Sequence, residues 1–365
     1  MTLPPLDRIP PQVVSLADYE PLARERMSPG AWAYLEGGAG DEWTLRENVA
    51  ALARRPLRPR VLRDMAGATT ATTLFGLPLA APILLAPVAF QKLAHLDGER
   101  ATALAAAALD TIMVVSTQAS VPIEEIAAQG PASLWFQLYI QPDRDFTAAL
   151  IARAERAGYR ALVVTVDAPV NGARNREQRA GFALPPGVEA VNLRGMRPLA
   201  PSPPDRLLFG TPLLEHAPTW ADLGWLRGLT RLPILLKGIV DPDDARRALD
   251  AGMNGIIVSN HGGRALDGLP ATIDLLAPVV EAVGRAAPVL MDGGIRRGID
   301  VLRALALGAD AVLVGRPYVH ALAAAGALGV AHMLRILRGE LELAMALAGC
   351  PTIAAVDASV LAPKS

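Results

Sequence analysis

The segment SNHGGR, residues 259–264, places a histidine and an arginine three positions apart around a Gly-Gly pair. His261 can accept a proton near neutral pH, and Arg264 can hold a carboxylate through two parallel hydrogen bonds. Asp167, which follows the apolar run ALVVTV (161–166), is suited to orient an imidazole and to stabilise its charged form. These residue types predict acid–base chemistry on a small substrate that carries a carboxylate.

Two glycine-containing turns in the C-terminal half predict an anion site. DGGIRRG (292–298) and VGRP (314–317) each follow an apolar run and precede a helical pattern. Glycine lets backbone N–H groups approach an anion, the helix start favours negative charge, and Arg296 and Arg316 can clamp it. A Gly-Gly pair can also be only a tight turn, but two such turns with an arginine each favour a phosphate. The sequence contains no Walker motif and no G-x-G-x-x-G after a strand, so a nucleoside triphosphate or NAD is not indicated.

Lys237 ends the apolar run PILLK (233–237) and needs an electron-rich partner if it is buried. Two roles are open for it, a Schiff-base lysine or a fixed positive charge beside an anionic ligand. A phosphate site opposite Gln137 and Thr165 predicts a long phosphorylated cofactor whose far end would reach Lys237. That combination points to flavin mononucleotide, FMN.

Composition excludes several classes of protein. The chain has 365 residues, of which 52% are hydrophobic and 19% charged, so it is not intrinsically disordered. Its net charge of −1 offers no field for nucleic acid or a membrane surface. A single cysteine, Cys350, excludes an intramolecular disulfide and a cysteine-based zinc cluster. No metal site is predicted, because the other histidines form no ligand-spaced pair: His95, His216, His320 and His332.

The N-terminus has no basic segment followed by an apolar run, so no signal peptide is predicted. Charged residues such as Asp110 and Arg335 interrupt or end the long alanine-rich stretches before they reach membrane-spanning length. We therefore expect a cytoplasmic protein with no membrane or nucleic-acid partner.

Short apolar runs without polar alternation recur along the chain, as is typical of parallel strands buried on both faces. Most are separated by alanine-rich segments with helical spacing, and eight such units predict a (β/α)8 TIM barrel, with a doubly wound sheet as the alternative. Active sites of such barrels lie at the C-terminal ends of the strands. The predicted strands are 82–87, 111–116, 133–138, 161–166, 233–238, 255–260, 288–294 and 311–316.

The spacing of the runs also predicts the domain organisation. We expect residues 1–80 to form an N-terminal helical cap that contributes to the site, and residues 81–350 to form the cofactor-binding barrel. The step from the fourth to the fifth strand is much longer than the others, so about 171–232 would be an insertion acting as a lid. Within it, 194–210 is too proline-rich for regular structure. Residues 351–365 would form a C-terminal tail.

Taken together, the chain resembles the FMN-dependent α-hydroxy acid oxidase and dehydrogenase family, which includes enzymes that oxidise glycolate, lactate and mandelate. The similarity extends from about residue 16 to 350. Its most specific stretches are GGAGDEWTLREN (37–48), APVAFQK (86–92), WFQLY (135–139), TVDAP (165–169), LLKGI (235–239), SNHGGRALDG (259–268), DGGIRRG (292–298) and LVGRP (313–317).

The resemblance implies a role for each matching position. Lys237 would stabilise negative charge at one edge of the reduced flavin, and His261 would take the hydroxyl proton as the α-hydrogen leaves, supported by Asp167. The substrate would be bound by Tyr34, Gln118, Tyr139, Arg174, His261 and Arg264. The catalytic set would be His261, Asp167, Tyr139, Arg264 and Lys237. FMN would be held by Pro87, Val88, Ala89, Ser116, Gln137, Thr165, Lys237, Ser259, Asp292, Gly293, Gly294, Arg296, Gly315 and Arg316.

The implied activity is oxidation of an L-2-hydroxy acid to the 2-oxo acid, with O2 as acceptor and H2O2 as product. Glycolate-type members have a tryptophan where this chain has Gln118. Losing that apolar wall favours mandelate-like or longer side chains over glycolate. The alternatives are a soluble dehydrogenase with another acceptor, a non-redox FMN-barrel isomerase, and a flavin-binding protein without turnover. The resemblance leaves hydride and carbanion routes open, and it implies a homotetramer or octamer.

Overall fold

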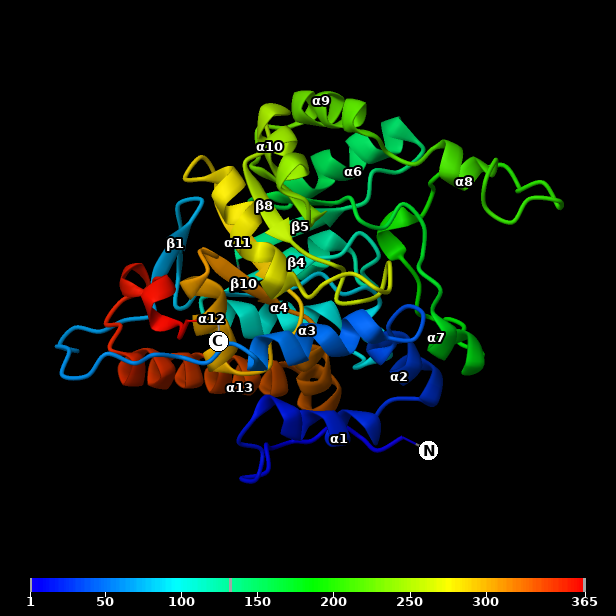
Figure 1. Cartoon of the computed structure of the whole chain (residues 1–365). Coiled ribbons are helices and arrows are strands. Elements are labelled where there is room, and N and C mark those ends of the chain that lie inside the picture. The colour runs from blue at the N-terminus through cyan, green and yellow to red at the C-terminus, as the bar shows by residue number, and fades with distance from the viewer. Residues whose placement is uncertain (1, 131–132, 364–365) are drawn as a thin grey trace.

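Eight parallel strands close into a barrel, as the sequence predicts (Figure 1). The structure, a computed structural model, describes residues 2–130 and 133–363. Around the barrel the strands follow the order β10-β3-β4-β5-β6-β7-β8-β9. Their bounds are β3 (Ile83–Leu85), β4 (Ile112–Val115), β5 (Ser133–Leu138), β6 (Leu162–Thr165), β7 (Ile234–Ile239), β8 (Gly255–Val258), β9 (Val289–Asp292) and β10 (Ala311–Val314).

Each barrel strand is followed by a helix of the outer layer, which after β6 is the third helix of a long connection. Alanine-rich sequences with glycine at their ends favour these helices. They are α4 (Glu99–Ala108), α5 (Ile123–Ala127), α6 (Arg144–Arg156), α9 (Trp220–Leu229), α10 (Pro242–Asp250), α11 (Thr272–Val283), α12 (Gly298–Ala306) and α13 (Arg316–Ala348).

The strands lack polar alternation because both of their faces are buried. Side chains pointing inward, such as Trp135 and Leu235, fill the barrel interior together with Leu313. Side chains pointing outward, such as Phe136 and Leu236, join the larger core between barrel and helices. These two apolar layers fix the strand ends, and therefore the polar residues that follow each strand.

Residues before the barrel lie at both of its ends. Helices α2 (Pro29–Glu36) and α3 (Trp43–Ala53) contribute Tyr34 and Asn48 to the cavity at the C-terminal ends of the strands. The hairpin of β1 (Thr72–Leu74) and β2 (Leu77–Leu79) instead packs Leu74 and Leu79 into the barrel interior. Helix α1 (Tyr19–Arg24) packs along α13. The N-terminal segment is thus partly helical cap and partly a hairpin plug.

The long connection between β6 and β7 contains α7 (Asn175–Arg179), α8 (Pro212–Glu215) and α9. Helix α9 buries Leu223 and Leu226 in the main core and serves as the outer helix of its barrel unit. By contrast, α8 stands away from the barrel in Figure 1. The part of this connection that can cover the site therefore ends before Trp220.

Helix α13 is long and apolar enough, by length and composition alone, to cross a membrane. Yet 67% of its most apolar 18-residue stretch is buried inside the fold. It packs against α1, α4 and α12, and its backbone is non-helical at Ala325 and Gly326. These contacts are those of a core helix, which the sequence analysis did not anticipate as one long element.

Candidate active site

A cavity of about 590 Å³ opens at the C-terminal ends of the strands. Every predicted site residue lines it except Asp167 and Ser259, which lie directly behind lining residues. The lining members of the predicted set are Tyr34, Pro87, Val88, Ala89, Ser116, Gln118, Gln137, Tyr139, Thr165, Arg174, Lys237, His261, Arg264, Asp292, Gly293, Gly294, Arg296, Gly315 and Arg316. The fold therefore gathers residues from eight strands and the cap around one space.

His261 forms a close pair with Asp167. The Nδ1 atom of His261 lies 2.8 Å from Oδ1 of Asp167, which makes Nδ1–H the donor and leaves Nε2 as the free ring nitrogen. Burial lowers the pKa of His261, the Asp167 charge opposes this, and Lys237 and Arg264 add to the lowering. Burial alone would raise the pKa of Asp167, but the charges of His261 and Lys237 lower it. At neutral pH the pair is thus a neutral imidazole beside a carboxylate.

The turn that carries His261 is strained. His261 has φ +56° and is followed by Gly262 at +60° and Gly263 at +74°. A left-handed conformation costs a non-glycine residue about 1–2 kcal/mol. A Cβ at Gly263 would lie 2.6 Å from the backbone nitrogen of Leu45 in α3, so the turn packs tightly under the cap. Gly263 is therefore required by close packing as well as by backbone conformation.

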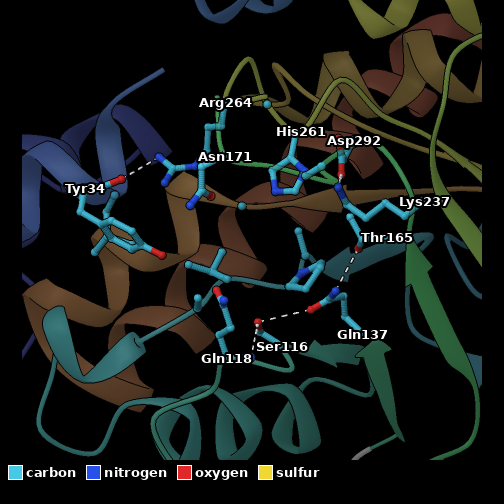
Figure 2. A pocket seen from close by; sticks show the side chains of 18 of the residues that line it. Tyr34, Ser116, Gln118, Gln137, Thr165, Asn171, Lys237, His261, Arg264 and Asp292 are labelled. Atoms are coloured by element: carbon cyan, nitrogen blue, oxygen red, sulfur yellow. Dashed lines mark hydrogen bonds and ion pairs between the residues drawn. The ribbon is translucent and has the colours of Figure 1, made fainter. Parts of the chain in front are cut away.

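Lys237 lies in a buried network with Ser259 and Asp292. Its Nζ is 2.9 Å from Ser259 Oγ and 3.2 Å from Asp292 Oδ2, and Ser259 Oγ donates to Asp292 Oδ1 at 2.7 Å. Burial works against the ammonium, but Asp292 and Asp167 raise the pKa of Lys237 overall. Lys237 is therefore a fixed positive charge and not the free amine that a Schiff base needs. Figure 2 shows it beside His261, with Asp292 next to its ammonium.

Gln137 connects two neighbouring strands across the cavity floor. Its Nε2 donates to Thr165 Oγ1 at 3.1 Å, and its Oε1 accepts from Ser116 Oγ at 3.3 Å (Figure 2). The same Oε1 also accepts from Thr117 N at 3.1 Å. These bonds fix the orientation of the Gln137 amide. The floor therefore presents oriented polar groups, as a heteroaromatic ring with donors and acceptors requires.

The ends of β9 and β10 form a cradle for an anion. The Nε of Arg316 is buried, makes no hydrogen bond with any described residue, and lies 3.9 Å from Glu36 Oε1. Burial lowers the pKa of Arg316 to about 9, although Glu36 opposes the shift, and burial also lowers the pKa of Arg296. Gly294 has φ +83°, and a Cβ there would lie 2.1 Å from the backbone oxygen of Asn48. The positive charge of these two buried arginines is not fully neutralised, and the glycine turn beside them has no side chains in the way. Such a site suits a phosphate group.

Arg264 and Arg174 occupy the opposite end of the cavity. Arg264 Nη1 donates to the carbonyl oxygens of Tyr34 and Gly37, both at 2.6 Å. Arg174 Nη2 donates to Asn171 Oδ1 at 3.1 Å. Figure 2 shows Arg264 and His261 side by side, with Tyr34 beyond Arg264. Two guanidinium groups beside an imidazole can hold a carboxylate next to a general base.

Tyr139 and Tyr34 also line this end. Burial raises the pKa of Tyr139 to about 12 and raises that of Tyr34 as well, despite the opposing charges of nearby cations. The Tyr34 ring stacks on Phe182 with ring centroids 4.7 Å apart. Both hydroxyls thus remain protonated and can donate hydrogen bonds to an anionic ligand.

Two carboxylates in the cavity wall were missed by the sequence analysis. Glu36 accepts a hydrogen bond from His320 at 2.6 Å; burial would raise its pKa, but His320 and Arg316 lower it to about 2. Glu177 lies within 3.4 Å of both Arg174 and Arg264. Both carboxylates belong to segments without strand periodicity. The sequence contained one indirect indication of them. Several arginines were predicted at the site, and buried arginines need anionic partners.

Comparison with known proteins identifies the family. The model of the FMN-dependent dehydrogenase family matches residues 23–363. The chain is 49% identical over 364 residues to an L-lactate oxidase of Alicycliphilus denitrificans, covering 99% of both chains. It is 45% identical over 350 residues to glycolate oxidase 1 of Zea mays, covering 94% of both.

Solved structures give the same result for the fold. A crystal structure of mandelate oxidase with benzoyl-formic acid matches with a TM-score of 0.87 and 46% identity, covering 96% of this chain and 98% of the other. The predicted (β/α)8 barrel and the resemblance stated above are both confirmed. The chain belongs to the FMN-dependent dehydrogenase family, with FMN as its cofactor, and is an FMN-dependent (S)-2-hydroxy-acid oxidase or dehydrogenase.

Proposed function

We propose that this protein oxidises an L-2-hydroxy acid to the corresponding 2-oxo acid, with His261 as the general base. The observation that carries the proposal is the pairing of His261 with Asp167 in a cavity that also contains Arg174 and Arg264. The pairing supplies a base of fixed orientation, and the arginines supply the site for the substrate carboxylate.

The chain's own residues suit FMN along the whole cavity. Arg296, Arg316 and the glycine turns would hold the phosphate, and the Gln137 amide with Thr165 would hydrogen-bond the ring system. Bound FMN supplies the acceptor for the two electrons that leave the substrate carbon. Lys237 would place a compact positive charge beside the cofactor and so favour its negatively charged reduced form, and the buried Asp292 keeps the lysine protonated.

The arginines and tyrosines orient the substrate. Arg174 and Arg264 would bind the two carboxylate oxygens, and Tyr34 and Tyr139 would donate hydrogen bonds to the same anion or to the hydroxyl group. This fixes the α-carbon with respect to both the base and the cofactor. A plain alcohol lacks the carboxylate and should be a poor substrate.

His261 removes the hydroxyl proton. Nε2 takes it while Nδ1–H remains bonded to Asp167, whose negative charge stabilises the imidazolium that forms. In all, the substrate loses two protons and two electrons, with one hydrogen coming from the hydroxyl group and one from the α-carbon, and it becomes the 2-oxo acid. With the hydroxyl proton on Nε2, the α-hydrogen leaves together with its bonding electrons as a hydride; on a carbanion route Nε2 would instead take the α-proton.

The cavity favours a substrate with an apolar side chain. Gln118 lines the cavity, and the lining also includes apolar residues of the connection after β6: Phe182, Leu184, Leu193 and Leu213. Apolar contacts of this kind favour a longer or aromatic substituent over the hydrogen of glycolate. The named relatives span lactate, glycolate and mandelate oxidases at 45–49% identity, so similarity alone does not rank these acids.

We take O2 as the electron acceptor, which gives H2O2, because the named relatives are oxidases. A dehydrogenase that passes its electrons to another acceptor is the second candidate. We expect the enzyme in the cytoplasm as a homotetramer or octamer. The connection after β6, from 171 to before Trp220, is expected to act as a lid over the substrate.

Anaerobic addition of substrate to the yellow holoenzyme tests the proposal. We expect (S)-mandelate to bleach the flavin band more efficiently than L-lactate or glycolate, and air to restore the colour with one H2O2 per turnover. Highest efficiency on glycolate would refute the proposed side-chain preference. Bleaching that air does not reverse would identify a dehydrogenase, and substrate conversion without bleaching would identify an isomerase.

A further inference from the structure

Arg174 and Arg264 share one carboxylate oxygen. Oε1 of Glu177 lies 3.3 Å from Nη1 of Arg174 and 3.4 Å from Nη2 of Arg264. The three side chains are only 15–16% exposed, and all of them line the cavity. Glu177 has no part in the proposed reaction, yet it lies between the two cations assigned to the substrate carboxylate.

The two arginines also share the ring of Tyr34. Their guanidinium carbons lie 6.0 Å (Arg174) and 5.2 Å (Arg264) from the ring centroid. Burial lowers the pKa of Arg264, Arg174 lowers it further, and Tyr34 and Glu177 oppose the shift. Since Tyr34 is protonated, Glu177 is the group with a full negative charge that offsets this repulsion.

Contacts with the cap hold Glu177 in place. Arg176, the preceding residue of α7, forms an ion pair with Glu42 at the start of α3. Phe182, which stacks on Tyr34, donates its backbone N–H to the Glu177 carbonyl oxygen at 3.0 Å. These contacts hold the chain on both sides of Glu177, and its carboxylate, only 15% exposed, lies beside the two arginines.

We infer that Glu177 determines specificity by setting the charge of the substrate site, so that the enzyme takes 2-hydroxy monocarboxylates and rejects dicarboxylates. This rests on the proposed function. Two arginines and one glutamate leave a net charge of +1, which a single substrate carboxylate neutralises. A second carboxylate would meet Glu177 instead of a free cation, and like charges in a poorly solvated site disfavour binding.

Binding of oxalate and oxamate to the holoenzyme tests this inference without turnover. The two anions have nearly the same shape, but oxalate carries a second negative charge where oxamate has an amide. Each is titrated against the visible absorption of bound FMN, in wild type and in Glu177→Gln. We expect the ratio of oxamate to oxalate dissociation constants to rise by about tenfold or more in the variant.

Two variants control for other causes. Glu177→Asp keeps the charge and should keep the wild-type ratio within about threefold. Glu189→Gln changes the net charge equally on the same connection, but Glu189 pairs with Arg194 at the surface, outside the cavity lining, and should change nothing. Glu177→Ala is a second neutral variant should Glu177→Gln fail to fold. An unchanged ratio in the folded neutral variant, or an equal change in Glu189→Gln, overturns the inference.

Failure of this inference can be distinguished from failure of the proposed function. A wild-type enzyme that oxidises 2-hydroxy acids while the neutral variant keeps the wild-type ratio refutes the role of Glu177 alone. A wild-type holoenzyme that binds neither anion and oxidises no 2-hydroxy acid refutes the proposed function, and the role of Glu177 with it.

Discussion

His261 and Asp167 are separated by 94 positions in the chain, yet their side chains meet at 2.8 Å. Asp167 follows β6 and His261 follows β8, so barrel closure and not local sequence creates the contact. Both residues are largely buried, and Lys237 adds a positive charge nearby. This arrangement keeps the aspartate ionised and the histidine neutral, which is the protonation state that a general base requires.

Replacing His261 by glutamine should remove proton abstraction and leave the cofactor bound. His261 is not among the residues proposed to hold FMN. The substitution should therefore leave the contacts with the cofactor in place. We expect flavin reduction by substrate in anaerobic stopped flow to slow by about 10²–10⁴-fold. The absorption spectrum of bound FMN serves as the control for an intact site. Reduction at near the wild-type rate would remove His261 from the mechanism.

Changing Asp167 to asparagine tests the pairing through pH. Activity requires neutral His261, so kcat/KM falls as pH drops through the pKa of His261, which burial holds below 6.5. Asp167 opposes that lowering, so its loss moves the acid limb to still lower pH. The plateau rate should nevertheless fall by about 10²–10⁴-fold, because the imidazolium loses its counter-charge. A limb that moves to higher pH would contradict the assignment.

The barrel and the strand-end residues could be predicted because buried parallel strands have a simple signature. Each run, such as ALVVTV or PILLK, is apolar on both faces, and the next polar residue must lie at the barrel mouth. Asp167, Lys237 and His261 all follow this rule. The distances between these three side chains, however, could be obtained only from the closed barrel.

Glu36 and Glu177 could not be predicted in the same way. Glu36 ends a cap helix, and Glu177 lies in a short helix of the long connection, so their positions depend on how irregular segments pack. The hairpin at Thr72–Leu79 was missed because its short strands are only three residues each. A sequence pattern locates helices and strands because their hydrophobic residues recur at a regular spacing. The packing of irregular segments leaves no such regular spacing in the sequence.

Gly294→Ala should disturb the contact between barrel and cap that shapes the phosphate cradle. A Cβ there would approach the Asn48 carbonyl oxygen to 2.1 Å at φ +83°. We expect a loss of about 2–5 kcal/mol in the free energy of unfolding and a lower FMN content. Gly158→Ala is the matched control, since Gly158 has φ +88° with nothing within 4 Å, and should cost only about 1–2 kcal/mol. Equal losses in the two variants would mean that the close contact is unimportant.

Lys237→Met should destabilise the protein because it leaves Asp292 buried without its ion pair. Removing one partner of a buried pair costs about 3–5 kcal/mol, which thermal or denaturant unfolding measures. The double variant Lys237→Met/Asp292→Asn removes both charges and should recover most of that loss. Both variants should reduce flavin slowly, since the positive charge is absent from each. A double variant as unstable as the single one would show that the pair itself is not the cause.

Gln118→Trp should reverse the proposed substrate preference. Gln118 lines the same cavity as the apolar residues of the connection after β6, and we expect an indole in its place to fill space that a phenyl substituent needs. We expect kcat/KM for (S)-mandelate to fall by about 10–200-fold relative to that for glycolate, the range of a hydrophobic pocket changed in size. Gln118→Leu keeps the side-chain volume and should preserve the wild-type order of substrates. If the tryptophan variant keeps the same mandelate-to-glycolate ratio, residue 118 does not form the wall that limits substrate size.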